Sequence, residues 1–399
     1  MRKLKLGFIG LGQATSKVMA RRDEIDTLPY VITDACDLRP HALDAFRKEF
    51  GGKVFDSPED LCRHSDIDVV YIATPAECHR EHVEIAARHG KHIVVEKPMA
   101  LSLADCEAMI KATEVAGVKM LAGHTHSFDA PIRKMREIIR GGTIGDVLMI
   151  NSWNFNDFNH RSRLTSELKT TRGPIYNQGP HQVDVVRQLG GGMVKSLKAK
   201  AIMDSLSETE GGWSCFMEFE NGAAATLVYD GRSLFDTSEL FWWVGEGGDA
   251  RPPETNRRQR QKYRRLKGLS RDEMEREFDR QKEQGRYGAR EFVQRGGGET
   301  RHQPFFGLTV VSCDRGAMRQ SRDGVIVYGD DGPQEIPLGL ELHGRAAELK
   351  EIYGGIVGNR PIFHDGYWAL ATLEVCTAIA DSVRESREIM LSRQVPVRE

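Results

Sequence analysis

The first 123 residues alternate between short apolar runs and longer stretches in which apolar residues recur at helical spacing. The apolar runs occupy residues 4–9, 30–36, 68–73, 92–95 and 119–123. Runs of this length with little polar alternation are typical of strands that are buried on both faces of a parallel sheet. Their regular alternation with helical stretches predicts a doubly wound parallel α/β sheet.

Beyond residue 147 the pattern changes, because apolar and polar residues alternate along several segments. Glu220-Asn221-Gly222 predicts a tight hairpin turn, since asparagine and glycine accept the backbone angles that such turns require. This part of the chain therefore predicts an α/β domain around a large, mostly antiparallel open sheet. The predicted strands span residues 147–153, 194–203, 213–220, 223–229, 239–245, 308–313 and 325–328, and a final helix spans 365–383.

The length of the chain supports two domains. Its 399 residues exceed the size at which single domains usually stop growing, about 250 residues. We predict one domain at residues 1–123, a second at 124–399, and within the second an insertion at about 249–300. The insertion is rich in arginine, but no aromatic platform or recognition motif accompanies its basic half. We expect a solvated helix or a subunit contact there.

Composition narrows the classes of partner. A net charge of −2 and a pI near 6.7 provide no basic field for nucleic acid, so a small molecule or another protein chain is the expected partner. No apolar run approaches the roughly 18 residues that span a bilayer, so no membrane segment is expected. The seven cysteines are scattered without any CxxC spacing. This pattern predicts reduced thiols, no disulfides and a cytoplasmic location.

A glycine turn follows the first predicted strand. In residues 10–15, Gly10 permits a tight turn and Gly12 lets the backbone approach a pyrophosphate at the start of the next helix. Gln13 and Ala14 complete this dinucleotide-binding turn. Thr15 stands where the usual pattern has a third glycine or alanine, so close packing of helix on strand is less assured.

The second predicted strand leads to an acidic residue at the distance expected for ribose recognition. Asp37 can accept both ribose hydroxyls of a dinucleotide, which favours NAD. Arg39 lies two residues further and could meet a 2′-phosphate, so NADP stays open as an alternative to NAD.

The third and fourth strands end in polar residues that belong at the ligand edge of such a sheet. Residues 68–73 lead to Thr74, Pro75 and His79, while residues 92–95 lead to Glu96-Lys97-Pro98. His79 and His82 with a single thiol form too thin a ligand set to predict a metal, so no metal site is proposed.

A lysine held beside a carboxylate can exchange a proton with a substrate hydroxyl, and a proline fixes the backbone that aims it. On these residues alone, Lys97 could equally belong to an exposed ion pair at a strand end.

Taken together, the motifs resemble those of the Gfo/Idh/MocA family of nicotinamide-dependent oxidoreductases along essentially the whole chain. The resemblance rests on the Gly10-x-Gly12 turn, residues 73–75 with His79, Glu96-Lys97-Pro98, and Gly179-Pro180-His181-Gln182-Val183-Asp184. It implies that Lys97 is catalytic beside the nicotinamide, that His181 is an acid/base on the substrate side, and that the Lys97-Pro98 peptide is cis. It also implies dimers or tetramers built through the open sheet.

One departure from the family pattern affects the proton chemistry. Family members commonly show Asp-x-Gly-x-His, whereas this chain has Asn177 in place of the acid. Asn177 can orient a substrate hydroxyl or His181 but cannot titrate, so the proton relay rests on Lys97 and His181. Because this residue is an amide, a cofactor-bound regulator that has lost turnover stays open as an alternative function.

Within the family, residues 176–184, 304–307 and 364–368 resemble the branch of phthalate 4,5-cis-dihydrodiol dehydrogenases. A polar loop at 154–172 carries basic residues that could bind a substrate carboxylate in bidentate geometry. The predicted substrate-binding residues are His124, Arg161, Arg163, Arg172, Asn177, His181 and His302. His126 is the alternative to His124, because two residues that alternate on an extended segment cannot both face the substrate. A sugar, inositol or related polyol is the alternative substrate, and it would not require the basic cluster.

Overall fold

The computed structural model describes residues 2–123, 125–161, 172–232, 234–289, 302–342 and 344–398. Its internal contacts divide the chain into two compact units. The first combines Met1–His124 with Arg280–Gly297 and Leu342–Leu373, and the second comprises Thr125–Asp279, Gly298–Glu341 and Glu374–Glu399. The first segment of the first unit ends at His124, one residue beyond the predicted first domain of residues 1–123. Two later segments, which the sequence-based division assigned to the second domain, pack with the first unit.

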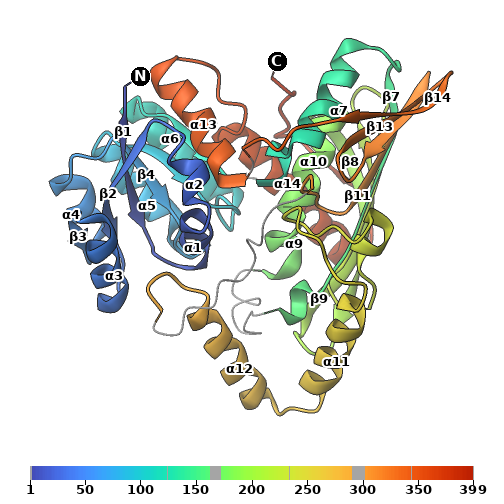
Figure 1. Ribbon diagram of the computed structural model, residues 1–399. Helices are drawn as coiled ribbons and strands as arrows, with labels where there is room; N and C mark the ends of the chain where they lie inside the picture. Colours follow the sequence, from blue (N-terminus) through green and yellow to red (C-terminus); the bar gives the residue numbers. More distant parts are fainter. Residues whose placement is uncertain are drawn as a thin grey trace. The chain divides into compact units, whose positions relative to one another are not determined.

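The first unit is built on a six-stranded parallel sheet with strand order β3-β2-β1-β4-β5-β6. Strand β4 is buried at every residue, as a central strand covered on both faces must be. This sheet confirms the predicted doubly wound fold (Figure 1). Its strands are β1 (Leu4–Ile9), β2 (Tyr30–Cys36), β3 (Val54–Phe55), β4 (Val69–Ile72), β5 (His92–Val95) and β6 (Met120–Ala122).

The helices of the first unit begin where local sequence supplies a cap. Ser57 and Ser102 each accept a hydrogen bond from a backbone N–H three residues on, which satisfies a donor at the start of α4 and α6. The helices are α1 (Gln13–Met19), α2 (Arg22–Ile25), α3 (Pro40–Phe50), α4 (Pro58–His64), α5 (His79–Arg88), α6 (Leu103–Ala116) and α13 (Gly344–Val357), with the 3₁₀ turn η1 (Ala76–Cys78).

Helix α13 places charged side chains beneath the end of β5. The Tyr71 hydroxyl donates to Oε1 of Glu96 at 2.8 Å, and Arg345 Nε donates to the same oxygen at 2.8 Å. Oε2 of Glu348 lies 3.5 Å from the Tyr71 oxygen. Glu96 and Glu348 are both buried. Two acids therefore share one guanidinium and one hydroxyl in the interior of this unit.

The two acids respond to that environment in opposite directions. Burial opposes ionisation of Glu96, but Arg345 and Lys97 outweigh it and lower its pKa. Burial and the charge of Glu96 together raise the pKa of Glu348 to about 8. The Tyr71 hydroxyl donates its proton to Glu96 and can still accept a hydrogen bond. A protonated Glu348 can donate that hydrogen bond to the Tyr71 oxygen.

The second unit contains a nine-stranded sheet with order β14-β13-β12-β11-β7-β10-β9-β8-β15. Only β7 and β10 pair in parallel among the strands of this sheet, which confirms the predicted mostly antiparallel arrangement. Its strands are β7 (Val147–Phe155), β8 (Val194–Asp204), β9 (Thr209–Phe219), β10 (Ala224–Asp230), β11 (Leu308–Cys313), β12 (Gly316–Gln320), β13 (Gly324–Gly329), β14 (Gly332–Pro337) and β15 (Ile389–Met390).

One face of this sheet packs against α10, which is buried along its whole length. The other face leaves large apolar side chains exposed on β7, β8 and β9, at Met149, Trp153, Ile202 and Phe216, which the strand register places on the same side of the sheet. The helices of this unit are α7 (Ala130–Gly141), α9 (Gly173–Asn177), α10 (Gly179–Gly190) and α11 (Thr255–Lys267), with 3₁₀ turns η2 (Thr125–Phe128), η3 (Phe158–His160) and η4 (Thr237–Phe241).

The strand predicted at residues 239–245 is wrong. The segment instead begins in η4, where Asp236 caps the turn by accepting a hydrogen bond from the backbone of Ser238. Trp242 and Trp243 then adopt φ values of 53° and 58°, which are incompatible with an extended strand. Only an isolated bridge between Val244 and Ala250 remains of the predicted pairing at this point of the chain.

The insertion lies between β10 and β11 and contains two helices, α11 and α12 (Arg271–Gln284), so the expected solvated helix is a helical hairpin (Figure 1). Most of its described side chains are exposed or half-buried. Leu266, Met274 and Phe278 form a small buried core between the two helices. Helix α12 and helix α14 (Gly366–Glu385) each contribute residues to both units.

Two further findings concern the whole described chain. None of its described helices combines the length and the apolar character that crossing a bilayer would require. All seven cysteines carry free thiols.

The buried Glu348 predicts a specific pH dependence of stability. The folded state holds this proton up to about pH 8, whereas the unfolded chain releases it near its ordinary value of 4.5. This group therefore makes the free energy of unfolding decline as pH rises between those values, by on the order of a few kcal/mol. Glu348→Gln should flatten that decline, as urea unfolding at pH 5.5, 7.0 and 8.5 would measure. Glu341→Gln, which alters an exposed pair with Arg133, is the control. An unchanged slope in the Glu348 variant would contradict the assignment.

Candidate active site

The glycine turn between β1 and α1 has the geometry that a dinucleotide requires. Gly10 adopts φ +91°, and a Cβ there would lie 3.0 Å from the carbonyl of Ala73. A Cβ on Gly12 would meet one atom within 4 Å, the Ala73 oxygen at 3.8 Å. The backbone of Gly12 therefore borders open space. No side chain caps the start of α1, which leaves its first N–H groups for a ligand.

Thr15 accommodates the departure from the three-glycine pattern. Its side chain is fully buried, and its hydroxyl donates to the Gly10 carbonyl at 2.6 Å. The side chain therefore fills the space between helix and turn and satisfies its own polar group there. Close packing of α1, which the sequence left less assured, is achieved with a threonine.

Asp37 stands just past the end of β2 and is joined to the glycine turn. Its Oδ2 accepts a hydrogen bond from Leu11 N at 2.7 Å, and its Oδ1 accepts from Arg39 N at 2.8 Å and Arg39 Nε at 3.0 Å. Arg39 Nη2 donates in turn to the Leu11 carbonyl at 2.7 Å. The guanidinium is thus folded back onto Asp37 and the turn. The carboxylate next to the glycine turn fits the ribose of NAD.

His79 links two strand ends of the parallel sheet. One ring nitrogen lies 2.9 Å from the Thr74 carbonyl, and the other lies 3.1 Å from the Pro98 carbonyl and 3.2 Å from that of Met99. Burial lowers the pKa of His79 although these carbonyls oppose the shift. The imidazole therefore holds the Thr74-Pro75 turn against the turn that carries Lys97.

His82 contacts the hydroxyl of Thr74 through Nδ1 at 2.9 Å. Within the described ranges, no group of three or more histidine, cysteine or acidic side chains is arranged to hold a metal ion.

Lys97 lies between two fixed neighbours in the chain. The Lys97-Pro98 peptide is cis, as the resemblance implied. Before it, the Glu96 carboxylate is held by Tyr71 and Arg345, and after it, the Pro98 carbonyl contacts His79. Glu96, which the sequence placed with the cofactor-binding residues, has its carboxylate engaged inside the protein. Its contribution is to hold the end of β5 from which Lys97 projects.

These residues fit NAD: Gly10 and Gly12 would leave room for its pyrophosphate, and Asp37 would accept the hydroxyls of its adenosine ribose. When bound, NAD supplies a nicotinamide ring that accepts hydride.

The part of the predicted site that lies in the second unit is centred on His181, in the first turn of α10. His181 is buried, and its ring lies 5.0 Å from that of His126 and 5.1 Å from that of Phe306. The rings of His126 and Phe306 are 4.7 Å apart. His126 Nδ1 lies 3.1 Å from Oδ2 of Asp129, which orients that imidazole. Two imidazoles and a phenyl ring therefore form one cluster.

Asn177 ends α9 and is buried, with its Oδ1 accepting a hydrogen bond from Gln178 Nε2 at 3.0 Å. Arg172 precedes this helix in the left-handed backbone region, and its guanidinium lies 4.0 Å above the Tyr176 ring. His302 pairs with Asp323 at 2.9 Å. His124 and Arg163 lie outside the described residues.

Arg161 is paired with acidic side chains of the protein, whereas an arginine that binds a substrate carboxylate would need its guanidinium open to the substrate. Its Nε bonds Asp157 at 2.5 Å, and its two terminal nitrogens each bond Glu246 at 3.2 Å. Although burial opposes ionisation, Arg161 holds the pKa of Glu246 at about 2. Both acids are therefore ionised partners of this guanidinium, and its charge is compensated within the unit.

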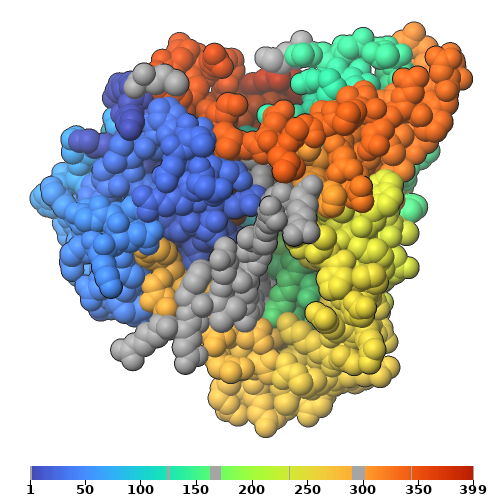
Figure 2. Space-filling view, in the orientation of Figure 1, coloured from blue at the N-terminus to red at the C-terminus, as the bar shows by residue number. Residues whose placement is uncertain are grey.

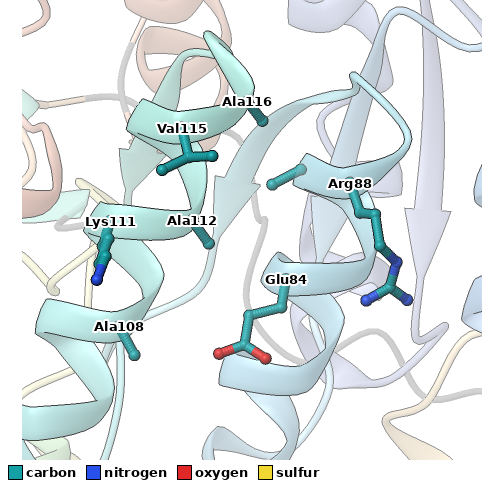
Figure 3. A pocket seen from close by; sticks show the side chains of 8 residues that line it. Glu84, Arg88, Ala108, Lys111, Ala112, Val115 and Ala116 are labelled. Carbon is teal, nitrogen blue, oxygen red and sulfur yellow. The ribbon is translucent and has the colours of Figure 1, made fainter.

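Figure 3 shows a hollow between the outer sides of α5 and α6. Alanine side chains make up half of its lining, and Glu84, Arg88, Lys111 and Val115 make up the rest. It contains none of the predicted site residues and is the seam between two neighbouring surface helices.

The sequence alone did not single out Arg345, Glu348, His126 or Phe306 for these positions. Phe306 lies in residues 304–307, which resemble the family branch, and His126 lies two residues after His124. Neither residue was predicted to contact His181. Arg345 and Glu348 carried no local signal, because their positions in α13 have a meaning only once the partners Tyr71 and Glu96 are known.

Comparison with known proteins agrees with this geometry. Residues 4–124 match the oxidoreductase family with an NAD-binding Rossmann fold, and residues 132–251 match the GFO/IDH/MocA C-terminal domain. The chain is 32% identical over 387 residues to 1-carboxy-3-chloro-3,4-dihydroxycyclohexa-1,5-diene dehydrogenase of Comamonas testosteroni, covering 95% of this chain and 94% of that protein. It is 32% identical over 261 residues to myo-inositol 2-dehydrogenase of Thermotoga maritima, covering 61% and 74% of the two chains.

A crystal structure of a protein named as a dehydrogenase, from Bordetella bronchiseptica RB50, has a TM-score of 0.87 and 34% identity, and the match covers 98% of this chain and all of that one. Both domains and nearly the full length are thus accounted for. The chain belongs to the Gfo/Idh/MocA family and is an oxidoreductase with an NAD-binding Rossmann domain.

Proposed function

We propose that this enzyme oxidises a carboxylated cis-dihydrodiol of the phthalate 4,5-cis-dihydrodiol type to the dihydroxy aromatic product, with NAD as acceptor. The observation that carries the proposal is the extent of similarity to the Comamonas testosteroni dehydrogenase. That similarity runs through 95% of this chain and 94% of the relative, whose name describes a carboxylated dihydroxycyclohexadiene substrate. The inositol dehydrogenase similarity covers a smaller part, 61% of this chain.

In the proposed reaction, Lys97 and His181 polarise one ring hydroxyl and remove its proton as the adjacent C–H transfers hydride to NAD. Asn177 is buried and can only donate or accept hydrogen bonds, so it orients the hydroxyl or His181 without exchanging a proton. The ketone product then shifts a ring proton to oxygen and becomes a catechol. Aromatisation makes oxidation the favoured direction.

The surroundings of His181 support a flat, unsaturated substrate. Phe306 and the two imidazoles present ring surfaces 4.7 to 5.1 Å apart by their centroids. A conjugated six-membered ring can stack on such surfaces, whereas a polyol with equatorial hydroxyls on all sides demands hydrogen-bond partners.

One observation favours the runner-up, oxidation of a sugar, inositol or related polyol. Arg161 was a candidate for binding the substrate carboxylate, and its charge is already compensated by Asp157 and Glu246. A carboxylate would therefore rely on Arg172 or on residues outside the described ranges. The two substrate classes differ in charge, which makes them separable by a direct assay.

We also propose that the enzyme is a homodimer or homotetramer through the open face of the nine-stranded sheet. Trp153, Ile202 and Phe216 are each more than two-fifths exposed on that face. Apolar side chains that stay exposed in one copy become buried when two copies pair through them.

Lys97→Met should lower turnover by roughly two to four orders of magnitude while NADH binding changes little, because the variant loses a proton-transfer group but keeps the cofactor turn. Absorbance of NADH would report turnover, and quenching of tryptophan fluorescence would report binding. Lys111→Met, on the outer side of α6, is the matched control. Near-normal turnover of the Lys97 variant would refute its catalytic role.

A panel of substrates tests the proposed class. We expect kcat/KM for a carboxylated cis-dihydrodiol to exceed that for myo-inositol by at least about 100-fold, since a site that fits one charge and ring shape discriminates strongly. Arg172→Ala should raise KM roughly tenfold for the carboxylated substrate and leave KM for its uncarboxylated analogue unchanged. Turnover of polyols alone would establish the runner-up, and equal effects on both analogues would exclude Arg172 from carboxylate binding.

A further inference from the structure

The end of the insertion packs against the cofactor-binding side of the first sheet. Residues 280–289, here called the insertion arm, comprise the last turn of α12 and the chain that follows it. Figures 1 and 2 show the gold and orange arm beside the blue elements of the first unit. The arm is more than 230 residues from the glycine turn in sequence, so no local pattern links the two.

Three contacts anchor the insertion arm on α3. The Tyr287 hydroxyl donates to Oε2 of Glu49 at 2.5 Å, and the Tyr287 ring packs edge-on against Phe46 with centroids 6.4 Å apart. Gly288 adopts φ +74°, and a Cβ there would lie 2.9 Å from Cα of Ala42. Only glycine permits this close approach of two backbones.

The arm also contacts the dinucleotide turn itself. Gln13, the residue after Gly12, donates from Nε2 to the Lys282 carbonyl at 3.3 Å. A Cβ on Gly285 would lie 2.9 Å from the same Gln13 nitrogen. The backbone of the arm therefore meets the first residue of α1, next to the turn that receives the pyrophosphate.

Glu283 carries the only acidic side chain of the arm and faces basic groups of the cofactor edge. Its Oε1 lies 3.8 Å from Arg39 Nη1 and 3.6 Å from His41 Nε2. Its Oε2 accepts a hydrogen bond from Arg286 Nη1 at 2.8 Å. Arg39 uses its other two nitrogens on Asp37 and Leu11, so Nη1 is the part of its guanidinium that points toward Glu283.

We infer that the insertion arm forms a wall of the adenosine end of the NAD site and that Glu283 makes the site select NAD over NADP. Arg39 alone left NADP open, because a guanidinium after the β2 acid can bind a 2′-phosphate. Glu283 faces Arg39, His41 and Arg286 together. A 2′-phosphate would have to displace that carboxylate or stand beside it.

The charges explain the direction of the effect. Asp37 and Glu283 balance Arg39 and Arg286, so the cluster is neutral when His41 is neutral. Removing the Glu283 charge leaves the cluster net positive, which attracts a phosphate that carries up to two negative charges. Glu283 is almost half exposed, so salt screens part of the effect.

Glu283→Gln should strengthen NADPH binding roughly tenfold at low ionic strength and change NADH binding less than about twofold. Fluorescence titrations of the full chain with NADH and NADPH measure both affinities without any substrate. Glu277→Gln removes the same charge from the same helix, where it pairs with Arg265, and should leave the affinity ratio unchanged. An unaltered ratio in the Glu283 variant would overturn the selector role.

Gly288→Val tests the arm as a wall. The side chain cannot fit against Ala42, so amide hydrogen exchange across residues 280–289 should rise and NADH affinity should fall several-fold. Gly332→Val introduces the same strain at the β13–β14 turn, where φ is +86°, and should leave NADH affinity unchanged. Increased exchange in the arm with unaltered NADH affinity would overturn the wall.

Both experiments measure cofactor binding, so their outcome is independent of the substrate proposed above. A wrong substrate class would leave the NADH and NADPH affinities of every variant as described.

Discussion

A carboxylate buried at the end of a parallel strand is costly unless it is compensated, and Glu96 is compensated by Tyr71 and Arg345. Tyr71 belongs to the neighbouring strand β4, and Arg345 belongs to α13, which lies more than 220 residues later in the chain. Because this triad fixes the end of β5, the backbone of Lys97 is held on one side by buried charge. On the other side His79 holds Pro98 and Met99. The predicted catalytic residue thus extends from a turn that has no freedom on either flank.

The same need for compensation shapes the second unit. Arg161 lies partly buried between Asp157 and Glu246, and these two contacts make a residue that could have bound a substrate carboxylate part of the scaffold. His126, in contrast, is oriented by Asp129 and packs on His181. Some charged groups of this unit therefore pair with one another, as Arg161 does, whereas others orient a ring that a ligand could contact, as Asp129 does. That division, more than the number of arginines, bears on which substrate class the enzyme accepts.

The composition of the insertion did not predict the contacts that it makes. Its arginine content resembles that of a nucleic-acid-binding segment, yet its helices form a small core of their own around Leu266 and Phe278. Its final residues pack on α3 and the glycine turn through Tyr287 and Gly288. A segment added between two strands of one sheet thereby adds a surface to the cofactor edge of the other sheet.

Local patterns determined the parallel sheet, the mostly antiparallel sheet, the glycine turn with Asp37, and the place of Lys97 at the end of a buried strand. Such features depend on the periodicity of apolar residues and on backbone angles that glycine and proline dictate. The choice of Lys97 and His181 as catalytic residues came from the resemblance to the family. The strand expected at residues 239–245 failed because a capping aspartate and two tryptophans at positive φ outweighed its apolar pattern. Tertiary structure decided the pairing of Glu96 with Arg345, the engagement of Arg161, and the contact of Glu283 with Arg39. The contacts of Arg345 with Glu96, of Glu283 with Arg39 and of Arg161 with Glu246 join residues 249, 244 and 85 positions apart in the chain. Electrostatic compensation acts through space, so no spacing along the sequence encodes which charge meets which.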